Sequence, residues 1–188
     1  MKEMLEIVSM TYLKNNENTK EDLRTALLQL MNNYYFDKIT VSMLCEKTGV
    51  NRSTFYYHYS DLDDLLYDAQ EEYFKELGMQ FDLLEKYEQL AKRDNLDKII
   101  AFLVDLKNSK DNKFKLFLEK GDPLQYYQHN INYFFNVFQI NDDTELSKRY
   151  RAFSYFSNSF QLVSAWIING YDLDEKELAD MIFNLEYK

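Results

Sequence analysis

The sequence has few of the residues that interrupt or cross-link a chain, with one Pro, one Cys and four Gly among 188 residues. A single Cys excludes an internal disulfide framework and a cysteine-rich zinc site. Scarce Pro and Gly, together with 46% hydrophobic residues, are typical of a helical protein with short connections. We therefore expect an all-α chain that is long enough to bury a substantial core.

Long apolar runs are missing as well. No stretch of about 20 apolar residues occurs, and the N-terminus has no basic region followed by an apolar segment. We therefore expect no membrane span and no signal peptide, and we expect a cytoplasmic location.

Residues that support metal or acid–base chemistry are scarce, with two His and one Cys. No spacing among them matches a metal site, and no nucleophile has an evident partner base. The sequence therefore predicts a protein that is not an enzyme and that has no metal or other cofactor. We interpret Cys45 as a structural thiol rather than a redox sensor.

Positive charge is in short supply, because the chain carries a formal net charge of −10. This balance argues against a protein that coats nucleic acid without specificity, since such binding depends on many Lys and Arg at phosphates. It does not exclude a sequence-specific reader with one local basic surface. Three bases and one acid lie between Lys38 and Tyr59, so the expected positive field is local and weak.

The most informative segment is residues 39–59, which read ITVSMLCEKTGVNRSTFYYHY. Two short amphipathic stretches flank Gly49, the residue best suited to the positive φ of a tight interhelical turn. An inward set can be formed by Leu44, Cys45, Val50 and Phe55, and an outward set by Lys47, Arg52, Ser53, Thr54, Tyr56, Tyr57 and His58. The pattern predicts a helix-turn-helix over about residues 40–59 whose outward side chains suit phosphates and base edges.

Capping signals and apolar periodicity predict the remaining helices. A turn-forming run, Asn15-Asn16-Glu17-Asn18, is expected to separate an N-terminal arm from a first helix that starts at the Thr19 capping box and ends near Phe36. Further helices are expected from a capping box at Ser60 to about Tyr87, over 96–106 and 114–118, from about Tyr127 to Asn141, over 146–168, and after Asp174.

The order of these signals, with Gly49-Val50, Thr54-Phe55-Tyr56 and Tyr59 at matching spacing, resembles the N-terminal domain of the tetracycline-repressor (TetR) family. The ending Trp166-x-x-x-Gly170 with a following capped helix is similar to C-terminal regions of Gram-positive members. The resemblance implies three parts: an arm at 1–16, a DNA-binding domain at 17–77, and a divergent helical regulatory and dimerisation domain at 78–188.

Carried over position by position, the resemblance assigns two kinds of DNA contact. Base edges in the major groove fall to Arg52, Ser53, Thr54 and Tyr57, and phosphates to Thr40, Ser42, Lys47, Tyr56 and His58. Many members have Lys at the start of the next helix, where this chain has Leu62 beside Asp61, Asp63 and Asp64. We therefore expect weaker DNA binding than in a typical member.

The chain is rich in aromatic residues, with 16 Tyr and 14 Phe, many of them in the second half. They can fill a helical core, or they can line a ligand cavity to which tyrosine hydroxyls contribute. The candidate ligand contacts are Tyr126, Tyr127, Tyr133, Tyr150 and Tyr155. The expected dimer bundle is formed by the last two helices, with interface candidates Phe156, Phe160, Val163, Trp166 and Ile182.

Together these patterns predict a homodimeric transcriptional regulator, most simply a repressor, that binds a palindromic DNA operator and responds to an unidentified small molecule. Two alternatives stay open. One is an adaptor that keeps the fold, has lost DNA binding and engages a protein partner, as Leu62 and the acidic residues after it suggest. The other is a helical carrier of an apolar ligand.

Overall fold

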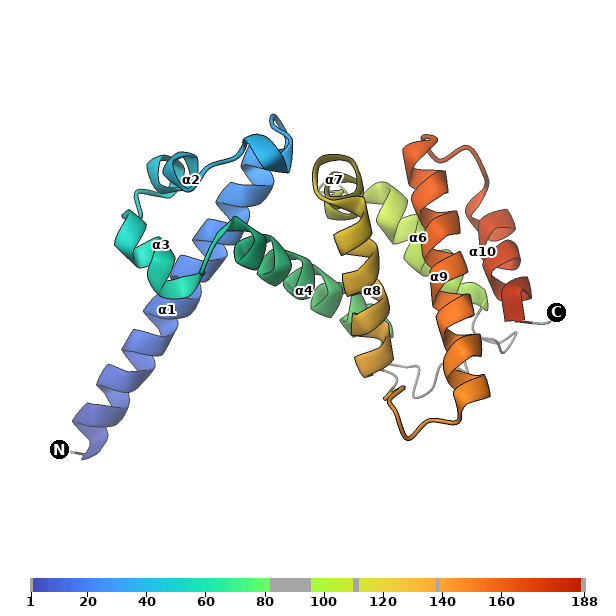
Figure 1. Cartoon of the computed structure of the whole chain (residues 1–188), viewed down its shortest axis with the longest axis horizontal. Helices are drawn as coiled ribbons and strands as arrows, with labels where there is room; N and C mark the ends of the chain where they lie inside the picture. The colour runs from blue at the N-terminus through green and yellow to red at the C-terminus, as the bar shows by residue number, and fades with distance from the viewer. Residues whose placement is uncertain (1, 82–95, 110–111, 138, 187–188) are drawn as a thin grey trace. The chain divides into compact units, whose positions relative to one another are not determined.

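The computed structural model describes residues 2–81, 96–109, 112–137 and 139–186, without the side chains of residues 2–15, 77–81, 137 and 186. The described residues form helices and no strand, which confirms the all-α prediction (Figure 1). The chain divides into two compact units, Met1–Gln70 and Glu71–Lys188. The sequence had placed the boundary of the DNA-binding domain seven residues later, at 77, within the same helix.

The N-terminal unit contains α1 (Lys2–Met31), a short 3-10 helix (Phe36–Lys38), α2 (Val41–Thr48), α3 (Arg52–His58) and the first part of α4 (Leu62–Phe81). The prediction of a turn at residues 15–18 and a new helix at Thr19 is wrong, because α1 runs through both. Asn has only a modest helix penalty, well under 1 kcal/mol per residue, and the segment has no Gly or Pro to stop the helix.

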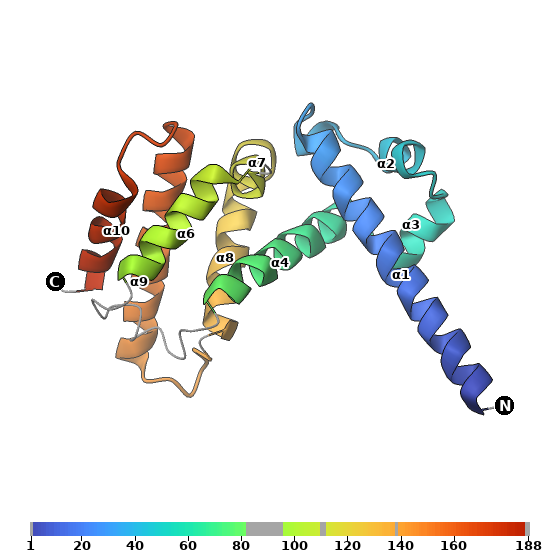
Figure 2. The same cartoon turned by 180° about the vertical axis from the view of Figure 1, so that it is seen from behind.

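A continuous apolar core joins the helices of this unit. From α1, Leu23, Leu27 and Met31 are fully buried at helical spacing. They share the core with Leu44 of α2, Phe55 of α3, and Leu65 and Leu66 of α4. Figures 1 and 2, which are opposite views, both show α2 and α3 on one side of α1.

A polar cluster ties three of these helices together at the edge of the core. Asp68 Oδ2 on α4 accepts a hydrogen bond from the Tyr59 hydroxyl at 2.6 Å and another from Arg24 Nη1 on α1 at 2.9 Å. Tyr59 is the residue that ends α3 and is only 3% exposed. The C-terminal end of α3 is therefore held by both its neighbours.

The acidic start of α4 forms a local cap. The backbone N–H of Asp64 donates to Asp61 Oδ1 at 2.9 Å, and Asp64 Oδ2 accepts from the N–H of Ser60 at 2.9 Å. Asp61 therefore caps the helix, one residue later than predicted, and Asp64 holds the residue before that cap. Two of the three acidic residues at this helix start thus have a structural role.

The C-terminal unit contains α6 (Leu96–Asn108), α7 (Lys113–Lys120), α8 (Pro123–Val137), α9 (Leu146–Ile168), α10 (Glu175–Phe183) and a 3-10 helix (Asn184–Glu186). In this unit α9 packs against α7, α8 and α10, and α10 also packs against α6. The predicted bounds of α9 are confirmed, whereas α8 ends at Val137, four residues before the predicted end. The amide of Ile140 donates to the carbonyl of Phe135 at 2.8 Å, with Gln139 at φ 55°, and closes that end.

An aromatic cluster fills the centre of this unit. Tyr126 is fully buried, and its ring centroid lies 5.3–5.7 Å from those of Phe74, Phe114, Phe117 and Phe160. Such pairs contribute about 0.5–1.5 kcal/mol each beyond the burial of their area. These aromatic residues of the second half therefore build a core, one of the two roles considered for the whole set.

The connection between α9 and α10 is fixed by Trp166. Its indole Nε1–H donates to the carbonyl of Leu173 at 2.9 Å, and the ring packs edge-on against Tyr171 with centroids 4.9 Å apart. Gly170 and Tyr171 both have positive φ, and the amide of Tyr171 donates to the carbonyl of Trp166 at 2.8 Å. Asp174 then caps α10, as predicted, because its Oδ1 accepts a hydrogen bond from the amide of Lys176.

Candidate functional site

The first helix of the predicted motif, α2, is capped at both ends and leads into a tight turn. Thr40 Oγ1 accepts from the N–H of Met43 at 3.3 Å and begins α2. Gly49 ends α2 with φ 74°, and its N–H donates to the carbonyl of Cys45 at 2.9 Å. The space around Gly49 is open, so the left-handed backbone rather than crowding calls for Gly here.

The start of α3 is organised by Asn51, a residue that the sequence analysis did not single out. Its Oδ1 accepts from the backbone N–H of Thr54 at 2.8 Å, from the Thr54 hydroxyl at 3.0 Å and from the Ser53 hydroxyl at 2.6 Å. Asn is among the preferred residues at this position. The Ser53 and Thr54 hydroxyls, two of the predicted base-reading groups, are therefore turned toward the first turn of their own helix.

The outer face of α3 presents large side chains to solvent. Tyr56 and Tyr57 are 57% and 63% exposed, whereas the preceding residue, Phe55, is fully buried in the core. The Arg52 guanidinium donates a hydrogen bond to the Ser42 hydroxyl, so it links the starts of α2 and α3. Lys47, in the last turn of α2, is also exposed. The motif thus offers an aromatic and cationic surface on a firmly seated helix.

His58 is less accessible than Tyr56 and Tyr57 and lies in a mixed electrostatic environment. Partial burial and the positive charge of Lys20 lower the pKa of His58 below its ordinary value, against a smaller opposing effect of Glu17. The imidazole is therefore mainly neutral near pH 7. A phosphate placed beside it would raise its pKa and favour the cationic form.

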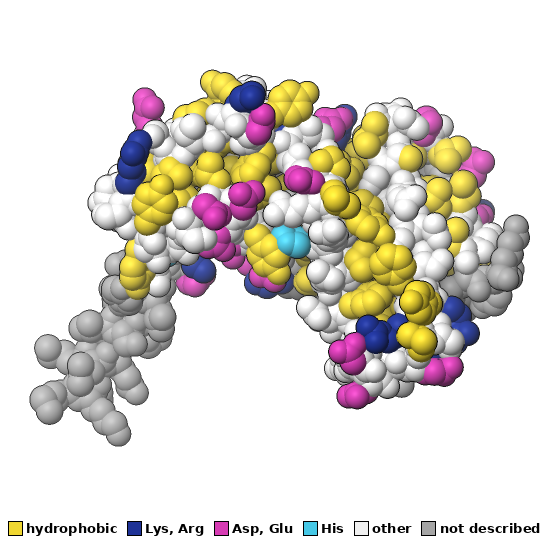
Figure 3. All heavy atoms as spheres, viewed as in Figure 1, with side chains coloured by type: hydrophobic (Ala, Val, Ile, Leu, Met, Phe, Trp, Pro, Cys, Tyr) yellow, Lys and Arg dark blue, Asp and Glu magenta, His cyan; other side chains and the backbone are white. Residues whose placement is uncertain are grey.

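The charge around the motif is sparse. Figure 3 shows Lys and Arg side chains on the visible face of the N-terminal unit as isolated groups among Asp and Glu, and not as one basic patch. Lys38 is paired with Asp37 at 2.8 Å, and this pair is largely exposed. Specific fit rather than a broad positive field has to carry any recognition of DNA.

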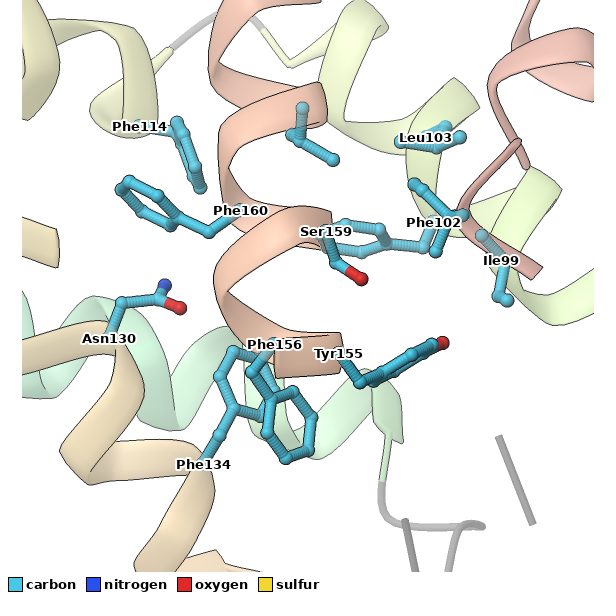
Figure 4. A pocket seen from close by; sticks show the side chains of 12 residues that line it. Ile99, Phe102, Leu103, Phe114, Asn130, Phe134, Tyr155, Phe156, Ser159 and Phe160 are labelled. Atoms are coloured by element: carbon cyan, nitrogen blue, oxygen red, sulfur yellow. The ribbon is translucent and has the colours of Figure 1, made fainter. Parts of the chain in front are cut away.

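The C-terminal unit contains a second candidate site, a partly open cavity of about 90 Å³ along α9 (Figure 4). Most of its lining is aromatic or aliphatic, and the polar lining residues are Asn130, Tyr155 and Ser159. In Figure 4, Asn130 lies on the α8 side of α9, and the Ser159 hydroxyl points toward the α6 side. The full lining consists of Ile99, Phe102, Leu103, Phe114, Asn130, Phe134, Tyr155, Phe156, Ser159, Phe160, Val163 and Ile182.

Comparison with solved structures adds one informative match. The crystal structure of a TetR transcriptional regulator from Streptococcus agalactiae 2603V matches with a TM-score of 0.63, covering 95% of this chain and 98% of that chain. The chain has a TetR fold. The two sequences are 18% identical. No family model and no curated protein matches the sequence.

Within the TetR fold, all nine predicted DNA contacts lie at the surface of the α2–turn–α3 motif. Seven are exposed, and Thr54 and His58 are half-buried. The contacts themselves stay a prediction. The exposed seven are Thr40, Ser42, Lys47, Arg52, Ser53, Tyr56 and Tyr57.

Of the tyrosines considered for ligand binding, only Tyr155 lines the cavity. Tyr126 belongs to the aromatic core, and Tyr150 is 69% exposed. The Tyr127 hydroxyl donates to Ser157 Oγ at 2.8 Å, and the Tyr133 ring packs on Phe74 with centroids 5.4 Å apart. Helical periodicity identified buried aromatics but could not say which of them border a space.

The residues expected at the dimer interface are buried within the single chain. Phe156, Phe160, Val163, Trp166 and Ile182 are each at most 9% exposed in the single chain. Little of their surface is therefore left for a partner in the single chain, and their place at an interface stays a prediction. All but Trp166 line the cavity along α9.

The groups that support the motif were not predicted from the sequence. Asn51 carried a recognisable signal, since it directly precedes a helical run. Lys20 and Asp68 carried none, because they are distant from α3 in the sequence. Lys20 Nζ lies 5.8 Å from the Tyr59 ring centroid, and Arg24 and Asp68 are 44 positions apart.

The described part of the chain lacks two further features. No cluster of three or more His, Cys, Asp or Glu there could hold a metal ion. None of the helices in that part has the length and apolar character needed to cross a membrane.

Proposed function

We propose that this chain is a homodimeric transcriptional regulator, most simply a repressor, that reads a palindromic DNA operator through α3. The observation that carries the proposal is the exposed Arg52 and Tyr57 face on a helix whose two ends are fixed by Asn51 and Tyr59. A rigid helix with exposed donors suits the major groove, which admits an α-helix and presents base edges to it. The TetR fold supports the same function.

In this proposal the nine surface residues divide into base contacts and phosphate contacts. Arg52 and Tyr57 extend from α3 toward base edges. The phosphates are held by Thr40, Ser42, Lys47, Tyr56 and His58. Ser53 and Thr54 can contact base edges in two ways. Their hydroxyls either release Asn51 and turn to the DNA, or accept a hydrogen bond from the DNA while they still donate to Asn51. Phosphate contacts set the register of the helix, and base contacts carry the specificity.

The proposed dimer interface is the outer face of α9 and α10. Ile168, Met181 and Leu185 are 55%, 43% and 37% exposed, and a shallow groove along the two helices is lined by Leu162, Met181 and Leu185 with Asn158, Gln161 and Asn184. Two copies of such a face form a four-helix contact about a twofold axis, which matches the symmetry of a palindrome. The last two helices remain the dimer elements, but on the face opposite to the predicted one.

A small molecule regulates DNA binding in this proposal by occupying the cavity along α9. The lining comes from α6, α7, α8, α9 and α10, so an occupant touches the helices that present the dimer face. Its effect on DNA binding is bounded by its differential affinity for the DNA-competent and incompetent states.

Selection of random DNA duplexes by the full chain, at low and at moderate salt, tests DNA reading. We expect an enriched palindromic sequence. Arg52→Ala and Tyr57→Ala should each reduce discrimination against random DNA by about 1–3 kcal/mol, while Lys47→Ala should lower both affinities and reduce the salt slope by about one. Unchanged selectivity of the Arg52→Ala, Tyr57→Ala double variant would refute the base-reading roles.

The dimer face has its own test in light scattering of the full chain. Ile168→Glu and Met181→Lys should convert a dimer into a monomer, because each buries a charge in an apolar contact. Leu124→Glu is the matched control, since Leu124 is 64% exposed in the same unit but lies on α8. A monomeric wild type, or equal dissociation by Leu124→Glu, would contradict this interface.

The adaptor alternative rested on Leu62 and the acidic start of α4. The structure gives Asp61 and Asp64 a capping role, which explains these acidic residues without a protein partner. If the selection enriches no sequence at either salt concentration, the adaptor becomes the better account.

A further inference from the structure

The cavity along α9 has a lining that restricts its occupant by charge. None of the twelve residues that line it is Asp, Glu, Lys, Arg or His, within the part of the chain that the structure describes. A charged molecule placed there would lose its hydration without an opposite charge to compensate, which costs several kcal/mol or more. The site therefore favours a neutral molecule.

The shape and the volume restrict the occupant further. Six of the lining residues are aromatic, and they come from α6, α7, α8 and α9. Rings of this kind pack well against another flat ring at offset or edge-on geometry. An apolar cavity of about 150 Å³ holds benzene. The partly open cavity of about 90 Å³ therefore has room for one six-membered ring after a small rotation of the lining rings, and it is too small to hold a fused ring system entirely.

One polar group in the lining lacks a partner. Among the described residues, the buried Ser159 Oγ has no hydrogen-bond partner, and Figure 4 shows it pointing toward the side of Phe102 and Ile99. An unpaired buried hydroxyl costs about 1–3 kcal/mol. A ligand hydroxyl at this position would recover that cost, while a ligand methyl group would not.

From these three restrictions we infer that the cavity binds a neutral, single-ring aromatic molecule with one hydroxyl group, a phenol in chemical class, with that hydroxyl paired to Ser159. Its part in regulating DNA binding rests on the function proposed above, but its recognition by the cavity does not. The ring contacts supply affinity, and Ser159 supplies the distinction between a hydroxyl and a methyl group.

Calorimetric titration of the full chain with phenol, toluene, benzoate and 2-naphthol tests this inference. Phenol and toluene have the same number of non-hydrogen atoms, so they differ mainly in the hydroxyl. We expect phenol to bind about 3- to 10-fold more tightly than toluene, and we expect no measurable binding of benzoate or 2-naphthol. Equal affinities for phenol and toluene, tighter binding of benzoate, or no binding of any neutral ring would overturn the inference.

Two serine variants locate the effect. Ser159→Ala should weaken phenol binding about 3- to 10-fold and leave toluene binding unchanged. Ser164→Ala is the matched control, because Ser164 Oγ is likewise buried without a partner among the described residues on α9 but does not line the cavity. Loss of phenol binding in both variants, or in neither, would overturn the assignment to Ser159. Both variants remove an unpaired hydroxyl and should fold, which a thermal melt verifies.

The outcome can be separated from that of the proposed function by adding phenol to the complex of the protein with its selected duplex. If phenol binds with the serine pattern above and the duplex stays bound, the ligand class stands and the effector role is wrong. If no duplex is ever selected, DNA reading fails while the titrations still decide the ligand class.

Discussion

The Tyr59–Asp68–Arg24 cluster permits a quantitative test of how α3 is held. Tyr59→Phe removes one hydroxyl and leaves the aromatic ring in the core. The hydroxyl donates to Asp68 Oδ2 at 2.6 Å, and Arg24 donates to the same oxygen at 2.9 Å. The change therefore removes one of two hydrogen bonds on a carboxylate that keeps its other partner.

The expected loss of stability follows from burial and charge. Hydrogen bonds to charged groups contribute about 1.5–3 kcal/mol. The Asp68 side chain is 21% exposed, so water replaces part of the lost interaction. We therefore expect Tyr59→Phe to lower the free energy of unfolding by about 1–2 kcal/mol. Tyr56→Phe is the matched control, since Tyr56 is 57% exposed on the same helix, and it should change this free energy by less than about 0.5 kcal/mol.

The pH dependence of the loss provides a second check. Burial raises the pKa of Asp68, but hydrogen bonds from Tyr59 and Arg24, with the charges of Arg24 and Lys20, outweigh it and hold the pKa below its ordinary value. A carboxyl group with a lowered pKa stabilises the fold fully above its unfolded pKa of about 3.9, and this contribution disappears as pH falls through the folded value. The difference between wild type and Tyr59→Phe should therefore be constant near neutral pH and shrink in acid.

Urea unfolding followed by far-UV circular dichroism gives the free energies of both variants. Hydrogen exchange read by mass spectrometry locates the change, which should appear in the amides of α3 and the first turns of α4. The reasoning is refuted if Tyr59→Phe and Tyr56→Phe have equal stability, or if the Tyr59→Phe deficit grows as pH falls below about 4.

Three further predictions concern the motif itself. Gly49→Ala should destabilise the protein by about 1–2 kcal/mol in urea unfolding, because Ala disfavours the left-handed backbone; a neutral result would contradict the role of φ. Asn51→Ala should cost about 1 kcal/mol and speed exchange of the first α3 amides, and unchanged exchange would exclude it as the cap. If His58 contacts a phosphate, the affinity for the selected duplex should rise as the pH falls from about 8 to about 6, because the DNA raises the lowered pKa of His58. The His58→Gln variant should lack this rise. A flat wild-type profile would count against the contact.

Local signals in the sequence predicted what depends on local structure. Gly49 marks the turn and Asp174 the start of α10, because a positive φ and an N-terminal cap each favour few residue types. The bounds of α9 follow from a long apolar period that ends before Asn169-Gly170. The helix-turn-helix is visible in the sequence for the same reason.

Properties that depend on tertiary contacts were not predictable in this way. The run at residues 15–18 has turn propensity, yet α1 continues through it, because such propensities are worth less than about 1 kcal/mol per residue. The periodicity of α9 shows that Val163 and Trp166 share an apolar face but not whether that face meets the same chain or another. The pairing of Arg24 with Asp68 bridges 44 positions, and no local pattern connects them.

Trp166 is the only tryptophan in a chain with 16 tyrosines, so its emission can be excited selectively at the long-wavelength edge. The indole is 2% exposed and bound to the Leu173 carbonyl, and Val163, a cavity-lining residue, precedes it by three positions on α9. Trp166 is therefore an intrinsic fluorescent reporter close to the cavity and at the connection to α10. Stopped-flow fluorescence of the unlabelled protein can time ligand entry and any resulting shift of the α9–α10 connection in a single trace.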